Sequence, residues 1–300
     1  MSRDVNSRPD ERALGSHDES RPVKVLDARR VLSADRRGSS WPVLVETDEG
    51  LRFTKLRGAG QGTGPLAAEI IVAGLAESIG LSVPERSLVR IPAAIESMDR
   101  DGELAELLAA SEGVNLGFAY LDGARPLTEQ EISQISDDDA AAILWLDWLV
   151  MNPDRTARNP NLLWWHDRMW LIDHGAALGF QYAWDAVVED GPRRPFIVWE
   201  PHLLHDRDVV GQWDEIFAAR LTRETIEDVV GAVPDTFLDP SLSASDLAAG
   251  DMLSRRRAAY VAYLWKRLKA PRDFRIVVAP GAESRRRSAP AWLTRRNPLP

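Results

Sequence analysis

A switch in hydrophobic pattern near residue 128 constrains the fold of this chain more than any other feature. Before it, short alternating apolar runs end at turn residues, which predicts strands, including a hairpin that turns at residues 48–50. After it, apolar runs begin with helix-capping residues, such as Thr128 with Glu131 three positions later. The pattern therefore predicts an α+β protein in which a small β-rich lobe precedes a larger helical lobe.

The absence of cysteine excludes several classes of protein. A chain without Cys has no disulfide framework, no cysteine zinc site, no iron–sulfur cluster and no cysteine nucleophile. No apolar run approaches the roughly 18–20 residues that span a bilayer, and the N-terminus lacks the apolar core of a signal peptide. We therefore expect a cytoplasmic protein without a membrane partner.

Charge is distributed unevenly along the chain. The formal net charge is −9, yet residues 254–300 carry +11 and the preceding residues carry −20. A nucleic-acid-binding protein is expected to have a basic body, so nucleic acid is not expected as a partner except through the basic C-terminal tail. A solvated tail is the simpler interpretation of this segment, and docking to an acidic partner or to nucleic acid is the alternative.

Both ends of the chain are predicted to be disordered tails. Residues 1–22 combine Arg, Asp, Glu and Ser with almost no apolar residues, and residues 276–300 are basic with two runs of arginine. The folded part is therefore predicted to span residues 23–275, with the β-rich lobe in residues 23–120 and the helical lobe in residues 121–275.

Polar side chains around a predicted hairpin form the densest candidate site. Asp154 and Asn159 lie five residues apart on one loop, and Asp173 follows a hairpin that is predicted to turn at residues 166–167. This register places Asp173 opposite Pro160, beside Asn159. A single Asp or Asn would be interpreted as a turn former. Together these oxygen ligands suit Mg²⁺, and a carboxylate not needed for the metal could orient or deprotonate a hydroxyl.

Lys55 is the candidate cation of the β-rich lobe. Its neighbours Phe53 and Leu56 imply a half-buried strand, and a half-buried ammonium group needs a partner. Glu69, on a helix predicted for residues 66–79, is the candidate partner. A lysine on an exposed strand edge would need no such partner.

Two glycine-containing loops are candidates for binding phosphate through backbone N–H groups. The first contains Gly38, Ser39 and Ser40, between the first two predicted strands. The second, residues 58–64, does not match a Walker motif, since no Lys-Ser or Lys-Thr follows its last glycine. Their position makes Gly38, Ser39 and Ser40 the preferred phosphate loop.

Four other polar residues are interpreted more plainly. His202 and His205 have the spacing of a zinc pair but no evident third ligand, so a surface or capping role is expected. Asp147 either braces the loop that follows its helix or is exposed. Arg155 either forms an ion pair within that loop or contacts a phosphorylated substrate.

The loop and the hairpin together resemble a known family. Residues 147–163, Asp-Trp-Leu-Val-Met-Asn-Pro-Asp-Arg-Thr-Ala-Arg-Asn-Pro-Asn-Leu-Leu, and residues 171–175, Leu-Ile-Asp-His-Gly, resemble the HipA-like kinases. These are relatives of protein kinases and of phosphatidylinositol kinases. The resemblance implies a protein-kinase-like two-lobe fold with ATP and Mg²⁺ as cofactors. It further implies a nucleotide-binding N-lobe in residues 23–120 and a catalytic C-lobe in residues 121–275.

By position, the resemblance implies a role for each residue of the polar site. Asp154 corresponds to the catalytic aspartate, and Asn159 corresponds to a Mg²⁺ ligand. Asp173 corresponds to the main Mg²⁺ ligand, which is the aspartate of the kinase Asp-Phe-Gly triplet. His174 and Gly175 follow it here, so a histidine replaces the phenylalanine of that triplet.

The resemblance extends into the β-rich lobe and covers about residues 23–180. Phosphate loop, strand lysine and helix glutamate follow one another in the order of the family. This order implies that residues 38–40 cradle the phosphates, that Lys55 binds them and that Glu69 positions Lys55. Longer HipA proteins have an additional N-terminal subdomain, so this chain is expected to be a short, single-module member.

The combined site predicts an ATP- and Mg²⁺-dependent phosphotransferase that acts on a protein Ser or Thr hydroxyl, the acceptor being taken by analogy with the family. A lipid or small-molecule kinase of the same fold is one alternative. A nucleotide-binding pseudokinase that serves as an interaction module is disfavoured, because the lysine, the catalytic aspartate and both metal ligands are present. A metal-dependent hydrolase or nuclease would leave Lys55 and Glu69 unexplained. A regulatory protein partner is compatible with the kinase function.

Overall fold

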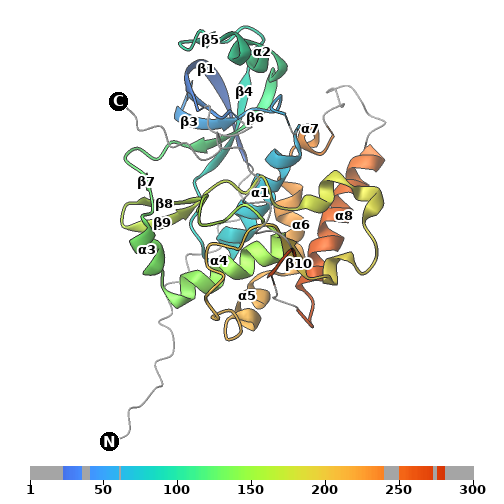
Figure 1. Ribbon diagram of the computed structural model, residues 1–300. Coiled ribbons are helices and arrows are strands. Elements are labelled where there is room, and N and C mark those ends of the chain that lie inside the picture. The colour runs from blue at the N-terminus through green and yellow to red at the C-terminus, as the bar shows by residue number, and fades with distance from the viewer. Residues whose placement is uncertain (1–22, 36–40, 61, 240–249, 273–275, 281–300) are drawn as a thin grey trace, which may run out of the picture.

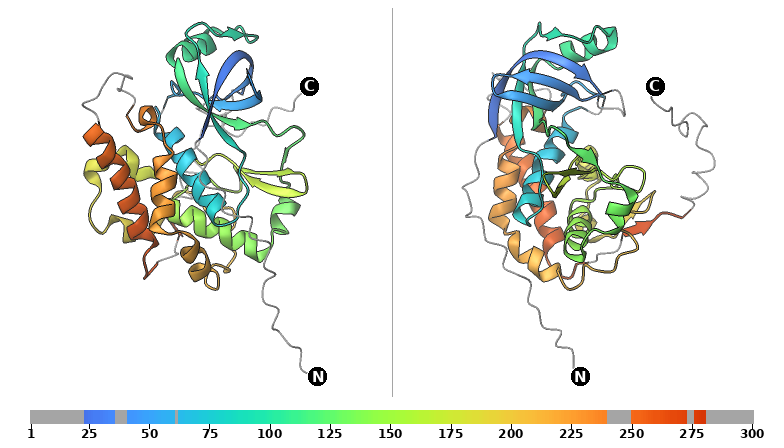
Figure 2. Two further views of the ribbon diagram at one scale, coloured as in Figure 1. Left: turned by 180° about the vertical axis from the view of Figure 1, so that it is seen from behind. Right: turned by 90° about the vertical axis from the view of Figure 1, so that its left-hand side faces the viewer.

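The structure is a computed structural model that describes residues 23–35, 41–60, 62–239, 250–272 and 276–280 (Figure 1). Most strands lie on one side of the described part of the molecule, and the long helices lie on the other (Figure 2). The α+β architecture, with a β-rich region before a helical region, is therefore confirmed. The predicted tail at residues 1–22 lies outside the described residues, as does most of the tail at residues 276–300.

The β-rich region is a small closed barrel. In spatial order its strands are β2 (Val43–Thr47), β3 (Gly50–Lys55), β6 (Gly113–Ala119), β4 (Arg86–Ile91) and β1 (Lys24–Ala34), and β5 (Glu96–Ser97) lies beside β1. Residues 24–27 of β1 pair with β4 and residues 28–34 pair with β2, so the long first strand changes partner and closes the sheet. Alternate branched side chains, among them Val31, Val43 and Val45, fill the interior.

The described helices fall on both sides of residue 128, although most of them follow it. They are α1 (Gly64–Ser78), α2 (Gly102–Ala110), α3 (Glu129–Ser133), α4 (Asp137–Val150), α5 (Asp214–Arg220), α6 (Arg223–Gly231), α7 (Asp235–Leu238) and α8 (Gly250–Leu268). Short 3-10 helices occupy Gly179–Tyr182, Trp184–Ala186 and Gly191–Arg193. The capping box of Thr128 and Glu131 is present, as predicted. None of the described helices is long and apolar enough to cross a membrane, and the cytoplasmic location stays a prediction.

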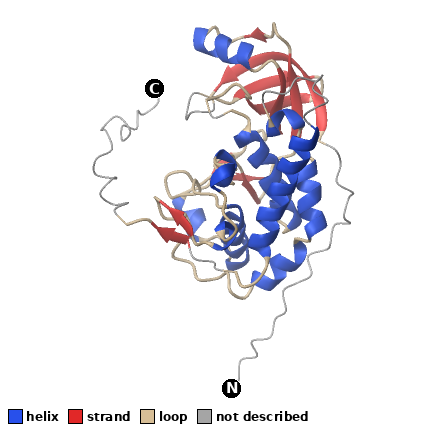
Figure 3. Cartoon of the chain, turned by 90° about the vertical axis from the view of Figure 1, so that its right-hand side faces the viewer, coloured by secondary structure: helices blue, strands red, loops and turns tan. Residues whose placement is uncertain are grey.

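Two smaller sheets lie outside the barrel. The hairpin of β8 (Leu162–Trp165) and β9 (Arg168–Leu171) has the predicted register, with Leu162 opposite Leu171, and β7 (Arg125–Pro126) pairs with β8. In the other sheet, β10 (Phe196–Val198) pairs in parallel with β11 (Ile276–Val278) (Figure 3). The sequence analysis did not predict this pair, because its two strands are remote in sequence. The pair also shows that described structure continues past residue 275.

α1, the helix that carries Glu69, packs into the helical core. Pro65 stands at its start, and Gly80, with a φ of 95°, follows its end. All residues from 66 to 76 are buried, and those other than Glu69 and Gly74 belong to the same core cluster as residues of α4, α6 and α8. Figure 2 shows α1 side by side with α6. A separate cluster of buried residues fills the barrel, so α1 is held mainly by the helical region.

The contact between α1 and α6 leaves no room for a side chain at Gly74. A Cβ at this position would lie 2.6 Å from Val229 Cγ1. We expect Gly74→Ala to lower the free energy of unfolding by about 1–2 kcal/mol, because overpacking outweighs the gain in helix propensity. In a Val229→Ala background, which removes Cγ1 but keeps a Cβ 3.1 Å away, the same substitution should cost clearly less. Urea denaturation of the four proteins measures both effects, and destabilisation of equal size in both backgrounds would contradict this packing.

Candidate active site

Lys55 and Glu69 form a buried ion pair between the barrel and α1. Lys55 is the last residue of β3 and is 8% exposed, and Glu69 is fully buried. Lys55 Nζ lies 2.5 Å from Glu69 Oε1, and the backbone N–H of Gly175 donates to the same oxygen at 2.9 Å. The structure thus brings together the two residues that the sequence analysis paired.

Lys55 also contacts Asp173, which follows β9. Nζ lies 2.6 Å from Asp173 Oδ1, and the Asp173 side chain is 45% exposed. Burial alone would lower the pKa of Lys55, but the charges of Glu69 and Asp173 raise this pKa above its ordinary value. Lys55 is therefore held as a cation between a buried carboxylate and one that is partly open to solvent.

Asp154 and Asn159 lie on the loop between α4 and β8. Asn159 Nδ2 donates to Asp154 Oδ2 at 2.9 Å, and Asn161 Nδ2 lies 3.4 Å from the same oxygen. Burial raises the pKa of Asp154, the hydrogen bond from Asn159 opposes this shift, and the charge of Asp173 adds to it. Asp154 and Asp173 are therefore close enough for one charge to act on the other. The sequence analysis gave Asn161 no role, although it stands only two positions after Asn159.

Asp147, near the end of α4, braces this loop from inside. Its carboxylate is fully buried and accepts hydrogen bonds from Arg155 Nε at 2.6 Å and from Asn152 Nδ2 at 3.0 Å. Burial would raise the pKa of Asp147, but the Arg155 guanidinium holds it well below its usual range. Arg155 is itself fully buried and also donates to Asn161 O at 2.8 Å. Of the alternatives left open by the sequence, the bracing aspartate and the ion pair within the loop are the ones observed.

His202 is also part of this buried network. The sequence analysis expected a surface or capping role for both histidines of the pair. That expectation fits His205, whose side chain is 51% exposed. It is wrong about the exposure of His202, which is 4% exposed and contacts Asp147 Oδ2 through Nε2 at 2.9 Å. The apolar pair Leu203 and Leu204 was the available signal that the chain turns inward here.

The preferred phosphate loop, Gly38, Ser39 and Ser40, lies outside the described residues. Its described flanks are joined by a hydrogen bond from Asp35 N–H to Pro42 O at 2.8 Å. β2 then begins with a residue that pairs with Thr54, the neighbour of the site lysine. The two flanks therefore stand at the end of the barrel where the lysine is located.

Asn159 and Asp173 are the residues that fit a Mg²⁺ ion. Nδ2 of Asn159 is engaged by Asp154, which leaves the amide oxygen as a metal ligand. Within the described part of the chain, no group of three or more Asp, Glu or His side chains could hold a metal by itself. Mg²⁺ is commonly held by one or two carboxylates together with substrate phosphates. This donor set therefore fits a metal that arrives with a nucleotide.

His174, directly after Asp173, is buried and electrically neutral. Its ring is 1% exposed, and neither nitrogen has a hydrogen-bond partner among the described residues. Burial lowers its pKa to about 3, and the positive charge of Arg155 acts in the same direction. The ring therefore packs like an apolar group, which explains how a histidine can stand where the kinase triplet has phenylalanine.

Comparison with known proteins identifies the family of this chain. Residues 29–190, more than half of the chain, match the HipA-like kinase family. No curated protein sequence gives a significant match. A solved structure of the Helicobacter pylori proinflammatory kinase CtkA aligns with a TM-score of 0.43 and 12% sequence identity, covering 81% of this chain and 97% of that one. The chain belongs to the HipA-like kinase family, as the motifs predicted, and is a kinase-type phosphotransferase.

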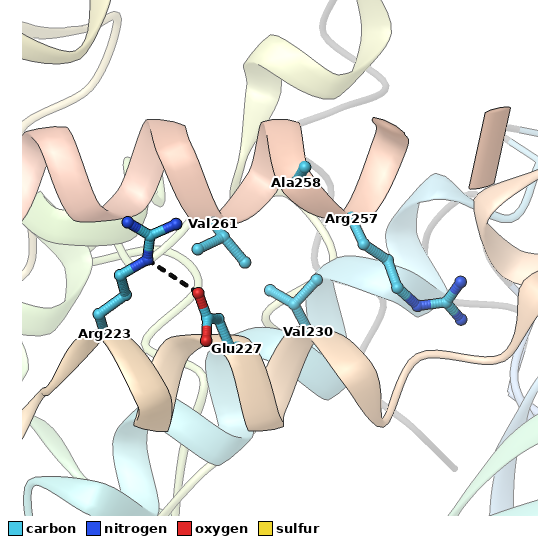
Figure 4. Close-up of a pocket in the computed structure, with 6 residues that line it drawn as sticks. All are labelled: Arg223, Glu227, Val230, Arg257, Ala258 and Val261. Carbon is cyan, nitrogen blue, oxygen red and sulfur yellow. Dashed lines mark hydrogen bonds and ion pairs between the residues drawn. The ribbon is translucent and has the colours of Figure 1, made fainter. Parts of the chain in front are cut away.

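A cavity of about 240 Å³ lies between α6 and α8 (Figure 4). Val230 and Val261 point into the gap between the two helices, Ala258 also lines the cavity, and the ion pair of Arg223 with Glu227 lies at one side. None of these residues belongs to the site described above. The cavity therefore has no part in that site.

The neutral, unpaired His174 predicts a specific dependence of stability on pH. Its pKa is about 3 in the folded chain and 6.5 in the absence of structure, so the unfolded chain binds more protons between these values. Stability therefore falls as the pH falls below about 6.5. Between pH 7 and pH 5, in the absence of nucleotide and metal, this residue should reduce the free energy of unfolding by about 2 kcal/mol.

Urea denaturation at both pH values measures this loss. His174→Phe should fold at pH 7 and lack this part of the pH dependence, whereas His166→Phe, at an exposed turn, should keep it. If His174→Phe shows the same pH dependence as the unchanged chain, His174 is not a buried neutral group.

Proposed function

We propose that this chain is an ATP- and Mg²⁺-dependent kinase with a protein-kinase-like two-lobe fold, which transfers the γ-phosphoryl group to a Ser or Thr hydroxyl of a protein. The observation that carries the proposal is the position of Lys55 Nζ, 2.5 Å from Glu69 and 2.6 Å from Asp173. This lysine between two carboxylates is the arrangement that kinases use to hold phosphates beside a metal. The protein acceptor follows from the family resemblance.

Lys55, Glu69 and Asp173 would form the phosphate and metal side of the site. Lys55 supplies a permanent positive charge for the phosphates, and the fully buried Glu69 keeps its ammonium group in place. Asp173 is partly exposed, so its carboxylate can turn from Lys55 to a metal, with Asn159 as the second protein ligand. Bound Mg²⁺ would neutralise the charge that develops on the phosphates during transfer.

Asp154 would act on the acceptor hydroxyl. Within the described part of the chain, side-chain amides reach only its Oδ2, which leaves Oδ1 for the acceptor. The hydroxyl oxygen forms a bond to the γ-phosphorus, the bond from that phosphorus to the β–γ bridging oxygen breaks, and ADP leaves. The hydroxyl proton passes to Asp154, whose raised pKa makes it a better acceptor than an ordinary carboxylate.

Nucleotide binding is tested first by thermal and chemical unfolding with ATP, with and without Mg²⁺. At 100 times its dissociation constant, a ligand of the folded chain stabilises it by about 2.7 kcal/mol. We expect Asp173→Asn to lose the Mg²⁺-dependent part of this shift. Asp167→Asn is the matched control, because Asp167 is exposed and both aspartates have a left-handed φ, 55° and 58°, which asparagine tolerates. A folded chain that shows no shift with ATP and Mg²⁺ would contradict the proposal.

Phosphoryl transfer is tested with labelled ATP against casein, histone and phosphatidylinositol vesicles. Asp154→Asn should lower transfer by roughly 10²–10⁴-fold, and its stabilisation by ATP and Mg²⁺ should remain. Label on the proteins supports a protein acceptor. Label on the vesicles alone would contradict a protein acceptor and indicate a lipid acceptor. Binding of ATP without transfer in the unchanged chain would instead favour a pseudokinase.

A further inference from the structure

The segment after β10 lies directly against the loop that carries the candidate catalytic aspartate. Leu203 N–H donates to Arg155 O at 2.9 Å, and Thr156 and His202 form an isolated antiparallel bridge. Backbone contacts therefore fasten the loop to a segment that is remote from it in sequence. The side chain of His202 enters the protein at this bridge.

The imidazole ring of His202 is buried, with both nitrogens in hydrogen bonds. Leu204 N–H donates to Nδ1 at 3.0 Å, so Nδ1 is unprotonated and Nε2 carries the hydrogen of the neutral ring. Nε2 therefore donates to Asp147 Oδ2 at 2.9 Å. This tautomer satisfies both contacts at once.

Asp147 connects His202 to the loop by further hydrogen bonds. Its Oδ2 also accepts from Arg155 Nε at 2.6 Å, and its Oδ1 accepts from Asn152 Nδ2 at 3.0 Å. Asn152 Oδ1 in turn accepts from the backbone N–H of Asp154 at 3.1 Å. A chain of hydrogen bonds thus runs from His202 to the backbone of Asp154 through two intervening side chains.

We propose that His202 is a positioning residue that holds the backbone of Asp154 through Asp147 and Asn152. The inference rests on the proposed function, in which Asp154 acts on the acceptor hydroxyl. A displacement of about 1 Å at such a group can cost roughly a hundredfold in rate. The residues proposed to bind phosphate, and Asp173, lie on other elements, and only the proposed metal ligand Asn159 shares the loop of Asp154. Loss of His202 should therefore act mainly on turnover and leave most of the affinity for nucleotide in place.

Variants of the full chain are compared by hydrogen exchange and by kinetics. His202→Leu removes both hydrogen bonds, and His202→Gln keeps a donor near the position of Nε2. His205→Leu is the matched control, since it removes a half-exposed histidine three residues away. With His202→Leu we expect faster amide exchange in residues 152–161, and kcat lowered roughly ten- to hundredfold with the KM for ATP changed by less than about twofold. His202→Gln should recover most of both losses, and the control should match the unchanged chain.

Amide exchange in residues 152–161 that is unchanged by His202→Leu overturns the inference. A Gln variant as impaired as the Leu variant also overturns it, as does a loss of nucleotide affinity equal to the loss of kcat. If His202→Leu does not fold, His202→Asn replaces it, because this shorter side chain keeps an acceptor for Leu204 N–H but does not reach Asp147. Amide exchange needs no turnover, so it tests the role of His202 even if the unchanged chain is inactive. Inactivity of the unchanged chain would contradict the proposed function and not the role of His202.

Discussion

The buried ammonium group of Lys55 is the constraint on which the arrangement of the site depends. A charge inside a protein is stable only when opposite charges and hydrogen bonds meet it. Lys55 meets one carboxylate from α1 and a second from the segment after β9. Lys55 belongs to the barrel, Glu69 to a helix of the helical core, and Asp173 to the segment after the hairpin. The two ion pairs of Lys55 therefore fix the positions of these three parts relative to one another. The same alignment places the residues that we propose to bind nucleotide and metal.

The burial of α1 limits how far this alignment can change. Residues 66–76 of the helix are all buried, and Gly74 lies so close to Val229 that a Cβ would overlap with it. A movement of α1 would therefore open contacts throughout the helical core, where close packing makes each lost contact costly. The packing of α1 thus fixes the position of Glu69.

The residue pairings predicted from the sequence agree with the structure where the partners follow local rules. Loop spacing and hairpin register correctly predicted that Asp154, Asn159 and Asp173 lie near one another. Once the turn of a hairpin is known, the partner of each residue on the opposite strand is known too. Glu69 could be proposed as the partner of Lys55 because the two are only 14 residues apart and the lysine needed one. Contacts across 118 residues, from Lys55 to Asp173, or across 55, from His202 to Asp147, have no such local signal.

The amino-acid sequence was enough to predict a β-rich region before a helical one, the hairpin beside the site and the chemical identity of the candidate site residues. Alternation, helical period and capping depend on neighbours a few positions away, so they can be read along the chain. Three features follow from contacts between distant parts of the chain: β1 closes a barrel, α1 joins the helical core, and His174 and His202 are buried. These outcomes depend on which distant surfaces meet, and on the free energy of removing charged and polar groups from water once they do.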